Sequence, residues 1–286
     1  MTKLTNLLAA CRACLLPLTA ALALAISAQA QTGPASTYYL TQYTGGGPGA
    51  RLFVINGTTI TAITDNLNFA APIAVSGTTV RTAAFTPGSA GNIYDLAGNL
   101  TGATATFPVG PSQAYDATSD GIANYFVDFG NGTVFRSNLD FSNPVQLSGA
   151  GFNNLGSGNF LGSTFDSTNN SLWISGWGAF EVRDISLVDG AVLSSFVPRD
   201  LNGTALQTMV GFARDPLTDT LWLGALTQNR FFQFSKSGVL LQTVDIPAIG
   251  GAFLLGGEFL AVPEPSTYAL LALGLSGVIW FRRRRA

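Results

Sequence analysis

The sequence repeats itself in two stretches, TFDSTNNSLWISGWGAFEVRDISLVDGAVLSSF at residues 164–196 and GFARDPLTDTLWLGALTQNRFFQFSKSGVLLQTVDI at residues 211–246. A weaker third copy precedes them, AYDATSDGIANYFVDFGNGTVFRSNLDFSNPVQL at residues 114–147. Short runs rich in Thr, Val, Phe and Ser alternate with Gly, Asn, Asp and Pro, a pattern typical of β-strands joined by turns. Self-similarity at a fixed period indicates a repeat architecture, in which each copy is one supersecondary unit.

Matched residues set the length of the repeat. Asp166 and Trp173 of the first stretch correspond to Asp215 and Trp222 of the second, both at a spacing of 49 residues. The tryptophans lie in the apolar runs LWI and LWL, which read as buried strands. Because a large indole ring contributes most to stability when it is buried, we expect both to pack between repeat units.

The third copy aligns less closely. Asp116 lies 50 residues before Asp166, and Tyr125 takes the position of Trp173 after a two-residue insertion. Each copy carries a second Asp or Asn shortly after its first Asp, namely Asp120, Asn170 and Asp219. Such pairs are either turn residues that satisfy backbone amides or calcium ligands. The turn interpretation is favoured, because the Asp-x-Asp-x-Asp-Gly pattern of a calcium loop is missing.

Turn signals extend the repeat toward the N-terminus. Five hairpins are predicted to turn at or near Gly57, Asn99, Asn143, Gly190 and Gly238, at intervals of 42, 44, 47 and 48 residues. Five units of about four strands each have the size of propeller blades. The predicted fold is therefore all-β, a β-propeller-like array of five blades of about 42–50 residues.

Five Asn-x-Ser/Thr sequences also fall in turn contexts. They begin at Asn56, Asn99, Asn131, Asn169 and Asn202, and three of them read Asn-Gly-Thr. Asn-Gly suits the tight type I′ hairpin turn, so we interpret these sequences as turn chemistry rather than as glycan acceptors.

Composition excludes several classes of function. Only 10% of the residues are charged, against about 25% in a typical soluble domain. Two of the 14 basic residues lie near the start and four at the end, which leaves eight in the body against 15 acidic residues once Glu264 is set aside, so binding to nucleic acid is disfavoured. The chain has no histidine, and Cys11 and Cys14 are its two cysteines. Because the chain has no histidine, Ser-His-Asp and Cys-His catalysis are excluded. Both cysteines precede the predicted body.

The first 30 residues read as a signal peptide. Lys3 and Arg12 supply positive charge, an apolar run follows, and Ala28 and Ala30 form a small-residue cleavage pattern. An uncleaved membrane anchor is the alternative, which the shortness of the run disfavours.

The chain ends with VPEPSTYALLALGLSGVIWFRRRRA at residues 262–286. The apolar segment 268–281 would be about 21 Å long as a helix. Counted from Pro265 it has 17 residues, the lower limit for a membrane span. It is followed by a membrane stop of Arg282, Arg283, Arg284 and Arg285, which the positive-inside rule keeps in the cytoplasm. Pro263 and Pro265 keep the backbone extended just before this segment.

This ending resembles a PEP-CTERM sorting signal, a Val-Pro-Glu-Pro motif followed by a short span and an arginine cluster. The resemblance assigns the recognition motif to Val262, Pro263, Glu264 and Pro265. It implies an exported protein of a Gram-negative, exopolysaccharide-producing bacterium, whose tail a membrane-embedded exosortase recognises and removes. A plain C-terminal anchor is the alternative. The expected organisation is a signal peptide (1–30), an exported propeller-like domain (31–261) and a sorting signal (262–286).

The expected export and sorting suggest a non-enzymatic structural or recognition module at the cell surface or in an exopolysaccharide or biofilm matrix. Its expected partners are the exosortase, the inner membrane before processing, and exopolysaccharide or surface proteins; no cofactor, metal or nucleic acid is expected. Trp177, which glycines flank, is a possible sugar contact. Two alternatives remain: a carbohydrate-active enzyme with a carboxylate pair drawn from acids such as Asp128, Asp184 and Glu258, or a permanently tethered periplasmic scaffold.

Overall fold

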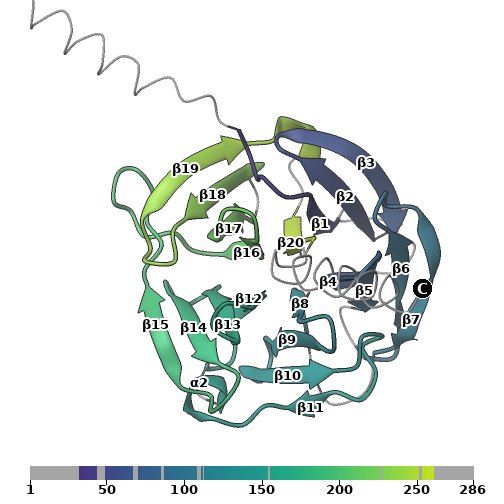
Figure 1. Ribbon diagram of the computed structural model, residues 1–286, viewed down its shortest axis with the longest axis horizontal. Coiled ribbons are helices and arrows are strands. Elements are labelled where there is room, and N and C mark those ends of the chain that lie inside the picture. Colours follow the sequence, from purple (N-terminus) through teal and green to yellow (C-terminus); the bar gives the residue numbers. More distant parts are fainter. Residues whose placement is uncertain are drawn as a thin grey trace, which may run out of the picture. The chain divides into compact units, whose positions relative to one another are not determined.

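A computed structural model describes residues 32–43, 49–66, 70–84, 87–107, 111, 113–153, 155–226, 228–250 and 253–260. Within this part of the chain, twenty strands form five four-stranded antiparallel sheets, which surround a central axis as the blades of a β-propeller (Figure 1). The predicted all-β, five-blade fold is therefore confirmed. The expected signal peptide and sorting signal lie outside the described residues.

Each blade runs from an inner strand beside the axis to an outer strand at the rim. The strands, from inside to outside, are β20 (Phe253–Phe259), β1 (Tyr38–Tyr43), β2 (Ala50–Asn56) and β3 (Thr59–Asn66) in blade 1; β4 (Ala70–Ser76), β5 (Thr79–Ala84), β6 (Ala90–Asp95) and β7 (Leu100–Thr106) in blade 2; β8 (Ala117–Ser119), β9 (Asn124–Asp128), β10 (Thr133–Ser137) and β11 (Val145–Gln146) in blade 3; β12 (Phe160–Asp166), β13 (Ser171–Gly176), β14 (Val182–Ser186) and β15 (Val192–Phe196) in blade 4; and β16 (Met209–Asp215), β17 (Thr220–Ala225), β18 (Arg230–Phe234) and β19 (Leu240–Asp245) in blade 5. Two short helices, α2 (Ala150–Asn153) and η1 (Pro247–Ile249), lie in connections between blades.

The C-terminal strand closes the ring. β20 pairs antiparallel with β1, with Tyr38 opposite Phe259, so the last strand of the chain supplies the inner strand of the first blade. The amide of Leu260 then donates a hydrogen bond to the carbonyl of Thr37 at 3.2 Å. Such closure pairs every inner strand and ties the two ends of the domain together.

The five predicted hairpin turns all lie between the third and fourth strands of their blades. Gly190 and Gly238 have φ of 72° and 84°, in the left-handed region that glycine adopts without penalty. The type I′ expectation is wrong at Asn56–Gly57. Gly57 has φ of 59° and no positive φ is found at the next residue, which indicates a type II′ turn with glycine at its first central position.

The two repeat tryptophans pack between blades, as expected. Trp173 belongs to a core cluster with Met209 and Phe212 of the next blade, and Trp222 packs with Leu40 of β1. Both side chains are about 1% exposed. Burying an indole removes on the order of 200 Å² from water, worth about 5 kcal/mol at most.

The predicted alignment of the third copy is wrong by one residue at this position. Ala117 pairs with Phe126, as Thr164 pairs with Trp173, so Phe126 rather than Tyr125 takes the tryptophan's place. The hairpin β8–β9 has a loop of the same length as β12–β13, and the two-residue insertion does not exist.

Glycine lets the inner strands approach one another at the axis. A Cβ atom at Gly162 would lie 2.6 Å from Phe212 Cβ of the next blade, and one at Gly257 would lie 2.7 Å from the carbonyl carbon of Gly211. Distances this short are not tolerated, so larger residues would force the blades apart.

Candidate functional site

The C-terminal ends of the inner strands meet around one cavity of about 180 Å³, which we call the axial pocket. Every blade contributes to it, because lining residues lie at or next to the last residue of each inner strand. Its most informative lining residues are Thr118, Ser119, Asp120, Phe165, Arg214 and Glu258.

Glu258 of β20 is the buried acid of the axial pocket. Its side chain is 6% exposed, and Oε1 accepts a hydrogen bond from the Phe259 amide at 3.0 Å. Oε2 has no hydrogen-bond partner among the described residues. Burial raises the pKa of Glu258 to about 8, although the Thr118 hydroxyl and the Arg214 charge favour the ionised form. The carboxyl is therefore mostly protonated at pH 7 and offers both a donor and an acceptor.

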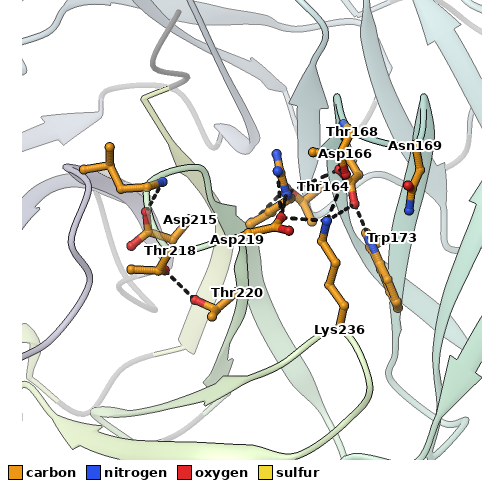
Figure 2. Close-up of polar contacts among 12 residues, drawn as sticks. Thr164, Asp166, Thr168, Asn169, Trp173, Asp215, Thr218, Asp219, Thr220 and Lys236 are labelled. Carbon is orange, nitrogen blue, oxygen red and sulfur yellow. Dashed lines mark hydrogen bonds and ion pairs between the residues drawn. The ribbon is translucent and has the colours of Figure 1, made fainter. Parts of the chain in front are cut away.

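Arg214 connects the pocket to a charged cluster between blades 4 and 5. Its guanidinium lies 2.7 Å from Asp219 and 3.4 Å from Asp166. Lys236 bridges the same two carboxylates at 2.6 and 2.7 Å, as Figure 2 shows. The cluster is electrically balanced, with two positive and two negative side chains.

Asp166 is the most densely bonded acid of this cluster. It accepts hydrogen bonds from the Thr168 amide at 2.9 Å and from Trp173 Nε1 at 3.2 Å (Figure 2). Burial opposes its ionisation, but Lys236, Thr168 and Arg214 outweigh burial and lower the pKa of Asp166 to about 2.

The first Asp of each of the two strong repeats satisfies turn amides, which agrees with the turn interpretation. In blade 5, Asp215 Oδ1 accepts from the Leu217 amide at 3.0 Å, the counterpart of the contact between Asp166 and Thr168. Asp215 also accepts from the Ala35 amide and the Ser36 hydroxyl, so it fastens the start of the described body to blade 5. Among the described residues, no group of three or more His, Cys, Asp or Glu side chains is placed to hold a metal ion.

Asp116 does not take the turn role that the sequence alignment assigned to it. It precedes β8 and lies at the axis, where it accepts hydrogen bonds from the amides of Gly257 (2.9 Å), Phe212 (3.0 Å) and Ala117 (2.9 Å), which belong to three different blades. Burial raises its pKa well above 3.8. Ser119 takes the turn position instead and accepts from the Gly121 amide. The sequence Tyr115-Asp116 resembles Phe165-Asp166, but β8 begins only after Asp116, whereas β12 ends at Asp166.

The structure separates the three acids proposed for a carboxylate pair. Asp128, at the end of β9, accepts from the Gly130 amide and from Asn131 Nδ2. Asp184 lies on β14, the third strand of its blade, close to Asn169 Nδ2. Neither lines the axial pocket, where Glu258 is found.

Trp177 lies at the opposite end of the propeller, directly after β13. It is half-buried and meets Phe129 edge to face, with 6.0 Å between ring centroids, and Phe129 meets Tyr115 in the same way at 5.3 Å. The Trp177 carbonyl accepts from the Thr208 amide, at the approach to β16. These three rings, the aromatic row, therefore belong to the face where the inner strands begin.

The other predicted site residues lie outside the described part of the chain. These are Ala28 and Ala30 of the cleavage pattern, Val262, Pro263, Glu264 and Pro265 of the sorting motif, and Arg282, Arg283, Arg284 and Arg285. No helix within the described residues is both long enough and apolar enough to cross a membrane.

Solved structures with a similar chain trace share little sequence with this chain. A chain of the nidogen/laminin complex is 13% identical with a TM-score of 0.47, and the alignment covers 79% of this chain and 98% of that one. A protein of unknown function from Bacteroides caccae is 14% identical (TM-score 0.43, 77% of each chain), and virginiamycin B lyase from Staphylococcus aureus is 15% identical (TM-score 0.41, 77% of this chain and 72% of that one). No curated protein matches the chain in sequence.

The C-terminal end does match a known family model. Residues 261–285 match the PEP-CTERM protein-sorting motif, which covers the predicted motif, span and all four arginines. The match begins one residue after Leu260, where the described part of the body ends. The chain is thus a five-bladed β-propeller with a PEP-CTERM sorting motif at residues 261–285, an exported protein targeted to exosortase.

Proposed function

We propose that this protein is a non-enzymatic recognition module of the cell surface or extracellular matrix, released from its membrane-anchored intermediate when exosortase removes the tail. In this proposal the propeller binds exopolysaccharide or surface proteins of the producing bacterium. The observation that carries the proposal is the sorting motif at residues 261–285, joined directly to a closed propeller.

The position of β20 supports removal of the tail without damage to the body. The closing strand ends at Phe259, and Leu260 is still hydrogen-bonded to Thr37. A cut at or beyond Val262 therefore leaves every strand of the five blades in place. A cut inside β20 would instead remove the inner strand of blade 1 and expose the edge of β1.

The arrangement of acids supports binding rather than glycoside hydrolysis. Hydrolysis by a carboxylate pair needs two acids on opposite sides of one glycosidic bond. Asp128 and Asp184 are used in hydrogen bonds away from the axial pocket. Asp120, the second acid of the pocket, accepts from the Ile122 and Ala123 amides and the Tyr125 hydroxyl. Asp116 accepts from three backbone amides. Trp177 and the aromatic row supply a second surface suited to contact with a sugar polymer, because aromatic faces pack against apolar ring faces.

The test compares the wild-type protein with a variant in which Pro263, Glu264 and Pro265 are all alanine. The wild-type protein should be recovered from the envelope or medium without its tail, whereas the variant should keep its full C-terminal mass and stay in the inner membrane. Equal masses and persistent membrane attachment of both proteins would contradict the proposal and favour the tethered scaffold.

A further inference from the structure

The axial pocket has the features of a binding site, and it is separate from both the sorting signal and the aromatic row. It is a cavity of about 180 Å³ to which all five blades contribute. That volume is well above what one water molecule needs, and below the roughly 300–1,000 Å³ of pockets for drug-sized ligands. It suits one small molecule, such as a single sugar ring.

One buried polar atom in the pocket has no partner. Glu258 is more than nine-tenths buried, it lines the cavity, and its Oε2 makes no hydrogen bond to a described residue. An unpaired buried polar atom is unfavourable, so native proteins rarely keep one without a compensating ligand or water.

The charges around Glu258 indicate a neutral ligand. Arg214 lines the cavity, but Asp166 and Asp219 already pair with its guanidinium, so little positive charge remains for an anion. Asp120 also lines the cavity and would repel an anion. A neutral carboxyl at Glu258 offers equally little to a cation, and Asp120 already accepts from two amides and the Tyr125 hydroxyl.

The remaining lining suits hydroxyl groups on an apolar ring. Ser167 contributes an exposed hydroxyl, and the Thr118 hydroxyl, which accepts from the Phe165 amide, lies beside Glu258. The ring of Phe165 forms an apolar wall of the same cavity. A sugar presents this combination of hydroxyl edges and apolar faces.

We propose that the axial pocket binds one small, neutral, polyhydroxylated molecule, a single sugar residue or the end of a glycan chain, whose hydroxyl groups hydrogen-bond to Glu258 Oε2. This inference rests on the proposed recognition function and adds to it a ligand class and a location. The pocket takes one ring, whereas the aromatic row at the other face can contact an extended polymer.

The test measures binding of glucose, galactose, mannose, N-acetylglucosamine and glycerol to the mature exported protein by ligand-observed NMR and calorimetry. Concentrations on the order of 10 mM are sufficient to detect a site of roughly millimolar affinity. At least one sugar should bind, and sodium sulfate and ammonium chloride should not compete with it. No binding by any of the five compounds, or competition by either salt, would overturn the inference.

Three variants locate the site. Glu258→Leu should weaken sugar binding at least about tenfold, because it removes the hydrogen-bonding group at similar size. Ser167→Trp should weaken binding by a similar factor, because Ser167 is exposed at the rim and an indole there fills the pocket without disturbing the core. Glu258→Gln keeps a donor and an acceptor and should stay within about threefold of wild type. Equal affinity in Ser167→Trp and wild type would overturn the inference even if Glu258→Leu fails to fold.

A polymer-binding assay separates this inference from the proposed function. Purified exopolysaccharide of the producing strain is tested against wild type, Ser167→Trp and Trp177→Ala. Polymer binding that survives in every variant, together with no sugar binding, would remove the pocket site and leave the recognition function standing. The absence of both polymer and sugar binding in the wild type would remove the pocket site and exopolysaccharide as a partner.

Discussion

Replacing Glu258 by Gln should make the folded protein more stable at neutral and mildly alkaline pH. The carboxyl has an ordinary pKa of 4.5, and burial in the axial pocket raises it to about 8. At pH 7 the unfolded chain therefore ionises this group while the folded protein keeps it protonated. Glutamine has nearly the same shape and no proton to lose, so the variant escapes this penalty.

The sign and size of the effect follow from linkage. Below pH 4.5 both states hold the proton, and Glu258 adds no pH dependence. Between pH 4.5 and about 8 the unfolded state binds fewer protons than the folded state, so the stability of the wild type falls as pH rises. A tenfold change in an ionisation constant is worth about 1.4 kcal/mol, so the whole interval corresponds to about 5 kcal/mol at most.

Urea unfolding of wild type and Glu258→Gln at pH 4, 5, 6, 7 and 8 measures this difference directly. The stability advantage of the variant should be near zero at pH 4 and grow to about 3–5 kcal/mol at pH 8. Burial and the neighbouring Glu258 charge both raise the pKa of Asp116. The variant loses the second of these contributions, which adds to its advantage at high pH.

Glu181→Gln is the matched control. Glu181 forms a partly exposed ion pair with Arg183 at 2.8 Å, and its pKa is lowered, so the substitution should cost no more than about 1 kcal/mol at pH 7. A Glu258→Gln advantage that does not change with pH, or a variant less stable than wild type at pH 8, would refute the account of a neutral, buried carboxyl.

Three further substitutions test other parts of the structure, each by urea unfolding. Asp116→Ala leaves three buried amides from three blades without an acceptor and should cost about 3–5 kcal/mol; a cost below about 1 kcal/mol would contradict its role at the axis. Trp173→Phe should cost about 1–2 kcal/mol more than Trp222→Phe, because only the Trp173 indole has a hydrogen-bond acceptor among the described residues; equal costs would count against this contact. Asp166→Asn should cost about 2 kcal/mol at pH 7, since the lowered pKa stabilises the folded state above pH 3.8 and this gain disappears as pH falls toward 2; a cost that is unchanged at pH 2 would contradict the ion-pair account.

Local turn chemistry explains why the blades were predictable. Gly190 and Gly238 themselves adopt positive φ angles, which glycine tolerates best. Each of them lies in a short turn between two strand-like runs, so the turn could be recognised from the sequence. The tryptophans of the two strong repeats were predictable for a similar reason, because each lies in a short continuous apolar run, LWI or LWL, within a strand that is buried on both faces. These features depend only on residues close together in the chain.

Features that depend on distant parts of the chain could not be predicted. The sequence of β20, FLLGGEF, does not indicate which strand it pairs with, yet it pairs with β1 more than 200 residues earlier. Asp116 was assigned to a turn because its neighbours resemble those of Asp166, while its true partners, Gly257 and Phe212, come from other blades. The axial pocket arises in the same way, since it exists only where the ends of five inner strands meet.

Mass spectrometry of the protein recovered from native cells tests the central claim most directly. The mature protein should retain the closing strand through Phe259 and lack the terminal Arg282, Arg283, Arg284 and Arg285, because exosortase acts on the motif at residues 261–285. Mature molecules from the envelope or the medium that still carry these four arginines would contradict the account.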